Sequence, residues 1–164
     1  MTLTVGSLFS GIGGIDIAFQ QAGFDIIWQV EIDEYATKTL DKNFPNTIKY
    51  KDIYDCNDLP YVDVITAGFP CQPFSVAGLR KGADDERFLI PKMLEVINYV
   101  QPKMVFLENV PGFPSLNDGD EFKQLLRAFT EMGFDAQWGH PRASDTGAPH
   151  RRERWFAVLP KSNR

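Results

Sequence analysis

The sequence predicts a doubly wound α/β fold with a mostly parallel sheet and helices on both faces. Short apolar segments typical of strands alternate with segments of helical periodicity along the chain. Glycine-rich or proline-rich turns, "SGIGG" and "GFPCQP", follow directly after two of the expected strands. Because connections between parallel strands are right-handed crossovers, the carboxyl ends of these strands meet at one edge of the sheet, where ligands bind.

The first part of the chain contains three expected strands and two expected helices. Residues 3–9 form the first strand, and the helix that follows ends at Gly23. The apolar positions of this helix are Ile15, Ala18, Phe19 and Ala22. Residues 25–33 are the second strand, residues 34–44 are a helix closed by a proline, and a short third strand is expected before Asp52.

The second part of the chain continues the same alternation. The expected elements are a strand at 61–68, a helix at about 88–99, a strand at 103–110, a helix at about 119–131 and two weaker strands near 134–139 and 154–159. No repeat, low-complexity tract or linker interrupts this order, so residues 1–164 are expected to form one domain.

The composition is that of an ordinary globular protein, with 164 residues, 43% of them hydrophobic and 24% charged. No apolar run approaches the roughly 20 residues of a membrane span, and the first residues lack the features of a secretory signal. The two cysteines, Cys56 and Cys71, have neither metal-ligand spacing nor the number that a disulfide framework needs. We therefore expect a cytoplasmic protein with no membrane contact and no metal.

The net charge of −5 argues against an extensive phosphate-binding surface, because neutralising phosphates needs clustered Lys and Arg. Basic residues do gather in "HPRASDTGAPHRRERWF" near the C-terminus, as Arg142, Arg151, Arg152 and Arg154. If nucleic acid is a partner, we expect the contact to be local, or another chain to supply most of the positive charge.

The turn "LFSGIGG" lies between the first expected strand and helix, where glycines let a ligand approach the backbone closely. It is neither a full G-x-G-x-x-G nor a phosphate loop, and a plain tight turn is the alternative. Glu31 ends the second strand about 20 residues after Gly11, a spacing at which a carboxylate can accept hydrogen bonds from ribose hydroxyls. Asp52 can accept from an adenine amino group, and Phe9 or Ile53 offers an apolar contact. We expect an adenosine-containing cofactor.

The stretch "AGFPCQPFS" holds Cys71 between prolines at the end of an apolar strand. The prolines restrict the backbone on both sides of the thiol, and the strand end directs it into the ligand crevice. Such a position suits a nucleophile, whose thiolate needs local positive potential to form. The alternative is an inert cysteine that serves as a small hydrophobic residue.

Glu108 and Asn109 end another apolar strand, at the edge of the sheet where Cys71 is expected. A glutamate desolvated in a cleft can donate a proton near neutral pH, whereas a solvated strand end is the alternative. Arg152 and Arg154 alternate on what we expect to be one strand face, for which a charged surface edge is the simpler explanation. The two histidines are isolated and are assigned no role.

These pieces, in this order, resemble the cytosine-5 DNA methyltransferase family. The resemblance runs through "LFSGIGGIDIAFQQAGF", "EIDEYA", "GFPCQPFS", "ENV" and "RRERWF", and so covers nearly the whole chain. The Pro-Cys-Gln followed by Glu-Asn-Val is the most specific part of it. The family fold is a Rossmann-like S-adenosylmethionine-dependent methyltransferase sheet, which agrees with the alternation described above.

The resemblance implies S-adenosylmethionine as the cofactor and S-adenosylhomocysteine as its product. Glu31 would hold the ribose, Asp52 with Ile53 the adenine, and Pro70 the methionine end. Ile32 departs from the family, in which many members carry an aromatic residue that stacks on adenine. The full set of implied cofactor residues is Phe9, Gly11, Ile12, Gly13, Gly14, Glu31, Ile32, Asp52, Ile53 and Pro70.

The resemblance also implies the chemistry. The substrate would be cytosine in double-stranded DNA, flipped out of the helix because its ring cannot be attacked within the stack. Cys71 would add to carbon 6, and Glu108 would stabilise or protonate ring nitrogen 3. Asn109 would fix Glu108 and the cysteine loop, Arg154 would contact the base oxygen, and Arg152 would assist nearby. The segment "SVAGLRKGADDER" resembles the family's active-site loop, which closes over the flipped base.

Family members usually continue past "RRERWFAV" into a target-recognition region and a final motif, both of which we expect to be absent from this chain. Three hypotheses follow. The chain is the catalytic part of a split enzyme whose second polypeptide supplies recognition, or a minimal methyltransferase that acts alone. The third is a non-catalytic S-adenosylmethionine-binding regulatory subunit or a decayed remnant. The intact chemical residues favour the first two, and RNA is the alternative substrate.

Overall fold

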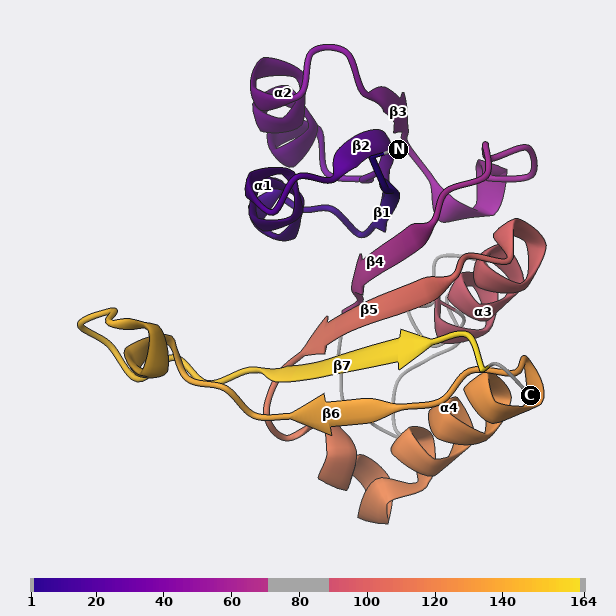
Figure 1. The fold of residues 1–164 in the computed structure, drawn as a ribbon, viewed down its shortest axis with the longest axis vertical. Helices are drawn as coiled ribbons and strands as arrows, with labels where there is room; N and C mark the ends of the chain where they lie inside the picture. The colour runs from indigo at the N-terminus through magenta and orange to yellow at the C-terminus, as the bar shows by residue number, and fades with distance from the viewer. Residues whose placement is uncertain (1, 71–88, 163–164) are drawn as a thin grey trace, which may run out of the picture.

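Figure 1 shows the computed structural model of the chain, which describes residues 2–70 and 89–162. Seven strands form one sheet in the order β3-β2-β1-β4-β5-β7-β6. The parallel strands are β1 (Thr4–Leu8), β2 (Asp25–Val30), β3 (Ile48–Tyr50), β4 (Val64–Gly68) and β5 (Met104–Asn109). β7 (Trp155–Pro160) runs antiparallel to β5, and β6 (Gln137–Gly139) runs antiparallel to β7. The expected α/β fold with a mostly parallel sheet is confirmed.

The α-helices lie within about two residues of their expected positions. They are α1 (Gly14–Gln21), α2 (Glu34–Asn43), α3 (Leu89–Val100) and α4 (Asp120–Glu131), and the short 3-10 helices are η1 (Ile53–Asp55), η3 (Phe113–Gly119) and η4 (Ala143–Thr146). Asp33 caps α2 by accepting the Ala36 N–H at 2.7 Å. Gly23 follows α1 with a φ of 89°, a left-handed conformation that favours glycine and ends a helix.

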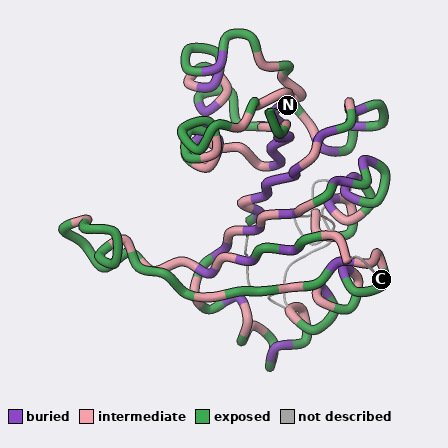
Figure 2. The backbone as a smooth tube through the Cα atoms, viewed as in Figure 1, coloured by how far each residue is buried: buried purple, intermediate pink, exposed green. Residues whose placement is uncertain are grey.

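The core lies mainly between the sheet and helices α3 and α4, and the buried residues follow the central strands (Figure 2). On this face the ring of Trp155 lies 5.2 Å from that of Phe113 and 5.7 Å from that of Phe122. Fully burying side chains of this size contributes about 1.5–3 kcal/mol each. The core therefore fixes β5 and β7, whose ends carry two of the expected catalytic residues.

Helix α1 covers the opposite face, where the ring of Phe19 lies 5.3 Å from that of Phe106 on β5. Phe156 and Val158 of β7 share this face with Phe106, because side chains alternate along a strand. Phe156 is half-buried and Val158 is 37% exposed. Helices lie on both faces as expected, but the described residues cover the second face only in part over β5 and β7.

The apolar face expected for α1 is wrong in one respect. Ala18 and Ala22 are exposed, and the fully buried residue of the helix is Asp16. The helix contacts the sheet along a narrow stripe, and Asp16 is accommodated there because Gln29 of β2 donates a hydrogen bond to it at 2.7 Å. Helical periodicity assigns apolar residues to the buried face, so it cannot predict a polar residue that is buried with a polar partner.

Candidate active site

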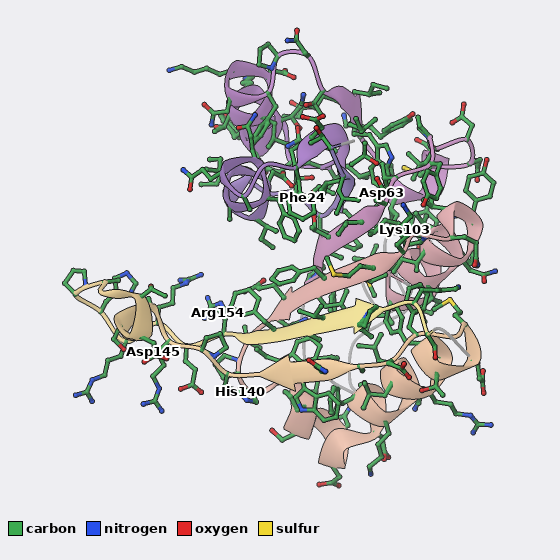
Figure 3. The ribbon with its side chains drawn as sticks, viewed as in Figure 1. Phe24, Asp63, Lys103, His140, Asp145 and Arg154 are labelled. Carbon is green, nitrogen blue, oxygen red and sulfur yellow. The ribbon has the colours of Figure 1, made fainter. Side chains whose placement is uncertain are left out.

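The carboxyl ends of β1, β2, β4 and β5 meet at one edge of the sheet, as parallel strands require. The antiparallel β7 begins at this same edge, so Arg154, one residue before it, lies beside the end of β5 (Figure 3). We call this side of the sheet, with its connecting turns, the carboxyl edge. The expected site residues from Phe9 to Pro70 and from Glu108 to Arg154 belong to segments that meet there.

The glycine turn between β1 and α1 has an unusual backbone. Phe9, Gly11 and Gly13 have φ values of 55°, 54° and 86°. A Cβ at Gly13 would lie 2.8 Å from the Phe44 ring and 2.9 Å from Leu40, so this glycine is required by packing. A Cβ at Gly11 or Gly14 would meet no atom of another described segment within 4 Å. The described residues thus leave the outer side of the turn open to a ligand.

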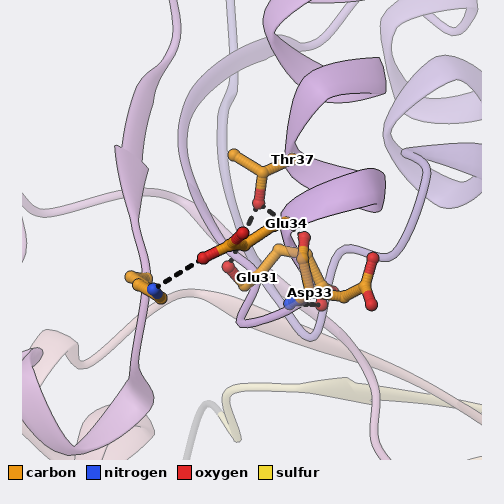
Figure 4. Close-up of polar contacts among 5 residues, drawn as sticks. Glu31, Asp33, Glu34 and Thr37 are labelled. Atoms are coloured by element: carbon orange, nitrogen blue, oxygen red, sulfur yellow. Dashed lines mark hydrogen bonds and ion pairs between the residues drawn. The ribbon is translucent and has the colours of Figure 1, made fainter.

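The Glu31 carboxylate binds backbone on two sides of the site. It accepts the Gly11 N–H at 2.7 Å and the Asp33 N–H at 2.8 Å, one on each oxygen. Figure 4 shows the second contact at the start of α2, where the Thr37 hydroxyl donates to the Asp33 carbonyl oxygen at 2.8 Å. Since a carboxylate has about four lone-pair positions, about two remain for two hydroxyl donors.

Two isoleucines expose apolar surface close to this carboxylate. Ile12, within the glycine turn, is 66% exposed. Ile32, which directly follows Glu31 in the sequence, is 64% exposed. Ile53, by contrast, is 4% exposed and belongs to the core. Asp52 caps η1 by accepting the Tyr54 N–H at 2.9 Å. Asp52 therefore has a role in its own fold that the sequence did not reveal.

Cys56 is a buried free cysteine in the described part of the chain. Its thiol donates to the Asp52 carbonyl oxygen at 3.3 Å, and burial raises the pKa of the thiol to about 11. A thiol with such a pKa is not a nucleophile near neutral pH. Cys71 and the segment "SVAGLRKGADDER" lie outside the described residues.

Glu108 and Arg154 form an ion pair at the carboxyl edge. Arg154 Nε lies 2.9 Å from Glu108 Oε1, and each side chain is 25% exposed. Arg154 Nη1 also donates to the Glu153 carbonyl oxygen at 2.8 Å. The other Glu108 oxygen is 3.3 Å from the position that a Cβ on Gly68 would take. The pair is therefore packed against the end of β4 and remains accessible to a ligand.

Asn109 is 2% exposed and connects the ends of two strands. Its Nδ2 donates to the Phe69 carbonyl oxygen at 3.1 Å, and its Oδ1 accepts the Val110 N–H at 2.8 Å. The side chain thus fixes the backbone directly before Pro70, which is exposed. The strand end that carries Glu108 and the segment that leads to Cys71 are held together by this one amide.

Arg152 and Arg154 both precede β7, so neither lies within that strand. They flank Glu153 in a short antiparallel pairing, in which the Arg152 carbonyl oxygen accepts the Ala143 N–H and the Arg154 N–H donates to the Pro141 carbonyl oxygen. Arg152 is exposed in the excursion between β6 and β7, in which Arg142 Nε pairs with Glu153 at 2.7 Å. Figure 3 shows this excursion, labelled at Asp145, projecting from the body of the molecule.

Comparison with known proteins decides the family. The model of the family described as C-5 cytosine-specific DNA methylase matches residues 3–164. The chain belongs to this family. Among curated methylases it is 39% identical to the type II methyltransferase M.Bsp6I of Bacillus sp. (strain RFL6), over 95% of the chain and 51% of that protein. It is 38% identical to the type II methyltransferase M.BsuFI of Bacillus subtilis, over 95% of the chain and 39% of that protein.

A triple mutant of Spodoptera frugiperda DNMT2 has a similar structure, with a TM-score of 0.82 at 25% identity over 99% of this chain and 51% of that one. This likeness agrees with the methyltransferase fold expected from the resemblance. The chain spans about half the length, or less, of the curated methylases named above.

Two further features concern partners. Within the described ranges, no helix has the length and apolar character needed to cross a membrane. Residues 2–70 and 89–162 contain no group of three His, Cys, Asp or Glu side chains that could hold a metal ion.

The sequence analysis missed the roles of Asp16 and Asp33. Asp33 stands directly before a helical segment, which is a capping signal that could have been recognised.

Proposed function

We propose that this methylase-family chain transfers a methyl group from S-adenosylmethionine to carbon 5 of cytosine in double-stranded DNA, with Cys71 as the nucleophile. The observation that carries the proposal is the arrangement of Glu108 and Asn109. Arg154 orients the Glu108 carboxylate, and Asn109 binds the Phe69 carbonyl oxygen two residues before Cys71. An acid and the segment that leads to the nucleophile are therefore tied to the same strand end.

The cofactor residues fit an adenosine group with a positively charged sulfonium and no phosphate. The unused lone pairs of Glu31 suit two ribose hydroxyls, and the exposed Ile12 and Ile32 offer apolar contacts for a purine ring. Asp52 would accept from the adenine amino group, and Pro70 would lie beside the methionine end. Ile53, which belongs to the core, would support Asp52 from within the fold. The turn Phe9–Gly14, with Gly11, Gly13 and Gly14, gives the cofactor close access to backbone. When bound, the cofactor supplies an electrophilic methyl group.

The remaining steps belong to this chain and to the base. Cytosine leaves the base stack before it can react. The Cys71 thiolate adds to carbon 6, while Glu108 protonates or stabilises ring nitrogen 3, so that electron density moves to carbon 5 and makes it nucleophilic. After methylation, a solvent base removes the carbon-5 proton, the Cys71 thiolate departs, and ring nitrogen 3 returns its proton to Glu108, which restores the aromatic ring and the acid. Arg154 holds Glu108 and is suited to contact the base oxygen, and Arg152 would assist nearby.

A covalent trap tests this function. DNA that contains 5-fluorocytosine cannot lose the group at carbon 5, so the enzyme should remain attached to it in the presence of S-adenosylmethionine. Denaturing electrophoresis should show the adduct for the wild-type chain and none for Cys71→Ser. Trapping that survives this substitution would remove Cys71 from the mechanism. Cofactor binding without any trapping would favour the alternative, a non-catalytic regulatory subunit or decayed remnant.

We further propose that a second polypeptide completes the catalytic half and supplies target recognition. The described residues leave the sheet face at Phe106, Phe156 and Val158 partly uncovered. This supports the proposal, because sheets of this kind normally carry helices over both faces. We expect weak transfer of tritiated methyl groups to mixed-sequence DNA by the lone chain, and strong transfer with the product of an adjacent reading frame. Robust, sequence-specific transfer by the lone chain would contradict the split arrangement.

A cytoplasmic location remains a prediction.

A further inference from the structure

Asp16 is a buried carboxyl group that the proposed mechanism does not use. It lies on the first turn of α1, directly after the glycine turn, and is 0% exposed. Helix formation does not require its burial, since an acidic residue near a helix N-terminus is favourable while exposed. Burying such a group costs free energy unless it has partners, so its contacts call for an explanation.

The partners of Asp16 come from the two strands that carry the cofactor residues. Gln29 of β2, which is 0% exposed, donates from Nε2 to Asp16 Oδ2 at 2.7 Å. Ser7 of β1 is 2% exposed, and its interaction with the Asp16 carboxyl lowers the pKa of that group. Asp16 therefore joins α1 to β1 and to β2 within the core of the site.

These contacts lead to both sides of the ribose position. The Ser10 hydroxyl donates to Ser7 Oγ at 3.0 Å, and the Ser10 carbonyl oxygen accepts the Gly13 N–H at 2.9 Å. Ser10 directly precedes Gly11, whose N–H binds Glu31 at 2.7 Å. On the other side, Gln29 lies two residues before Glu31 on the same strand. A single buried side chain thus connects the glycine turn with the strand that presents the ribose carboxylate.

The network lacks one hydrogen-bond donor. Asp16 Oδ1 and Gln29 Oε1 are both buried, and neither has a partner among the described residues. Burial raises the pKa of Asp16, while hydrogen bonds from Ser7 and Gln29 and the more distant charge of Lys49 oppose this shift. Lys49 itself donates to the Phe44 and Thr47 carbonyl oxygens at 2.7 and 2.9 Å. A neutral carboxyl group at Asp16 would supply the missing donor.

We infer that Asp16 is a positioning residue for the cofactor site, which acts through Ser7 and Gln29 to hold the glycine turn at a fixed place relative to Glu31. The inference rests on the proposed function of the carboxyl edge. It predicts that a neutral side chain with one donor and one acceptor can replace Asp16, because that is what Gln29 requires. It also predicts that loss of this side chain weakens cofactor binding more than its effect on stability explains.

The test measures the Kd of the full chain for S-adenosylhomocysteine by calorimetry, together with urea unfolding of the same samples. Asp16→Ala removes both polar atoms and should raise Kd about tenfold or more. Asp16→Asn offers an acceptor to Gln29 Nε2 and a donor to Gln29 Oε1, so its Kd should stay within about threefold of wild type. Ser7→Ala removes the hydroxyl that contacts Ser10 and interacts with Asp16, but it leaves the Asp16–Gln29 hydrogen bond in place. It should raise Kd about threefold to tenfold, which keeps the test decisive if Asp16→Ala fails to fold.

Asp63→Ala, on the opposite edge of the sheet, is the control for lost stability without lost positioning. An unchanged Kd in Asp16→Ala and Ser7→Ala would overturn the inference, as would Asp16→Asn binding as weakly as Asp16→Ala. Equal weakening by Asp63→Ala would also overturn it, because binding would then follow stability alone. If the wild-type chain does not bind S-adenosylhomocysteine, the proposed function itself fails; wild-type binding with unaffected variants removes only this inference.

Discussion

The two edges of the sheet use acidic residues in opposite ways. At the amino edge, where the strands begin, Asp63 accepts from the Thr4 N–H at 2.9 Å and from the Thr4 hydroxyl at 3.0 Å, and it pairs with Lys103 at 2.7 Å. Figure 3 shows Asp63 and Lys103 beside each other on the side away from Arg154. At the carboxyl edge, Glu31 and Glu108 keep part of their hydrogen-bonding capacity and remain partly exposed.

This difference separates residues that hold the fold from residues that are available to a ligand. The donors around Asp63, led by Lys103, lower the pKa of its carboxyl to about 2. Asp63 is thus committed to the contact between β1, β4 and β5. Glu108 has one arginine and Glu31 two backbone N–H groups, so each can accept a further donor without breaking the sheet. Variants on the two edges should therefore have opposite effects on stability and activity.

The largest effect on activity is expected at Glu108. Glu108→Gln keeps the size of the side chain but removes the carboxyl group that we propose protonates the base, so methyl transfer should fall about 10²–10⁴-fold. The free energy of unfolding should change by less than about 1 kcal/mol, since the Arg154 pair is partly solvated. Glu131→Gln breaks an exposed pair with Arg127 that has the same 2.9 Å distance and is the matched control. Full activity in Glu108→Gln would place the acid elsewhere.

A smaller effect is expected at Glu31. Glu31→Ala removes the proposed acceptor for two ribose hydroxyls and the partner of the Gly11 N–H. The Kd for S-adenosylhomocysteine should therefore rise about 10-fold to 100-fold. Glu34→Ala, which loses only an exposed pair with Lys51, should bind as the wild type does. Isothermal calorimetry measures both. Equal affinities in the two variants would show that the Glu31 carboxylate does not hold the cofactor.

The opposite pattern is expected at Asp63. Asp63→Asn weakens the contacts with Lys103 and Thr4 and should cost about 1–2 kcal/mol of stability at pH 7, with cofactor binding unchanged. Because the folded-state pKa of about 2 lies below the ordinary value of 3.8, the carboxylate stabilises the fold above about pH 4. This contribution is lost as the pH falls towards 2. Urea unfolding at several pH values should show the wild type and variant converging in acid; a constant difference would contradict the assignment.

The carboxyl edge was largely predictable from the sequence. Glu31 and Glu108 each end an apolar strand, and parallel topology brings such ends together whatever the details of packing. The Glu108–Arg154 pair could not be predicted from strand ends alone. It depends on β7 running antiparallel beside β5, and an apolar pattern does not indicate the direction of a strand. The apolar pattern also did not show that Arg152 and Arg154 pair with the segment after β6, in front of β7 rather than within it.

Residues whose role depends on distant partners were not predictable. Asp16 and Gln29 are 13 positions apart, and no local pattern indicates that a carboxyl on the first helix meets an amide on the second strand. Asp63 and Thr4 are 59 positions apart, and their contact forms only when β1 and β4 pair. Local patterns describe what each segment forms, whereas buried polar contacts arise from the choice of neighbouring strands.

The smallest effect is expected at Gly14, whose neighbour Gly13 in the same turn is packed against other residues while Gly14 is not. Gly14→Ala places a methyl group where no atom of another described segment lies within 4 Å, so the free energy of unfolding should stay the same or rise by up to about 1 kcal/mol. The same methyl group would face the cofactor and should raise the Kd for S-adenosylhomocysteine about threefold. Gly13→Ala is the control: its φ of 86° and its contacts with Phe44 and Leu40 predict a loss of stability instead. If Gly14→Ala binds with wild-type affinity, the cofactor does not approach the start of α1, and the open side of the turn belongs to the fold rather than to the ligand.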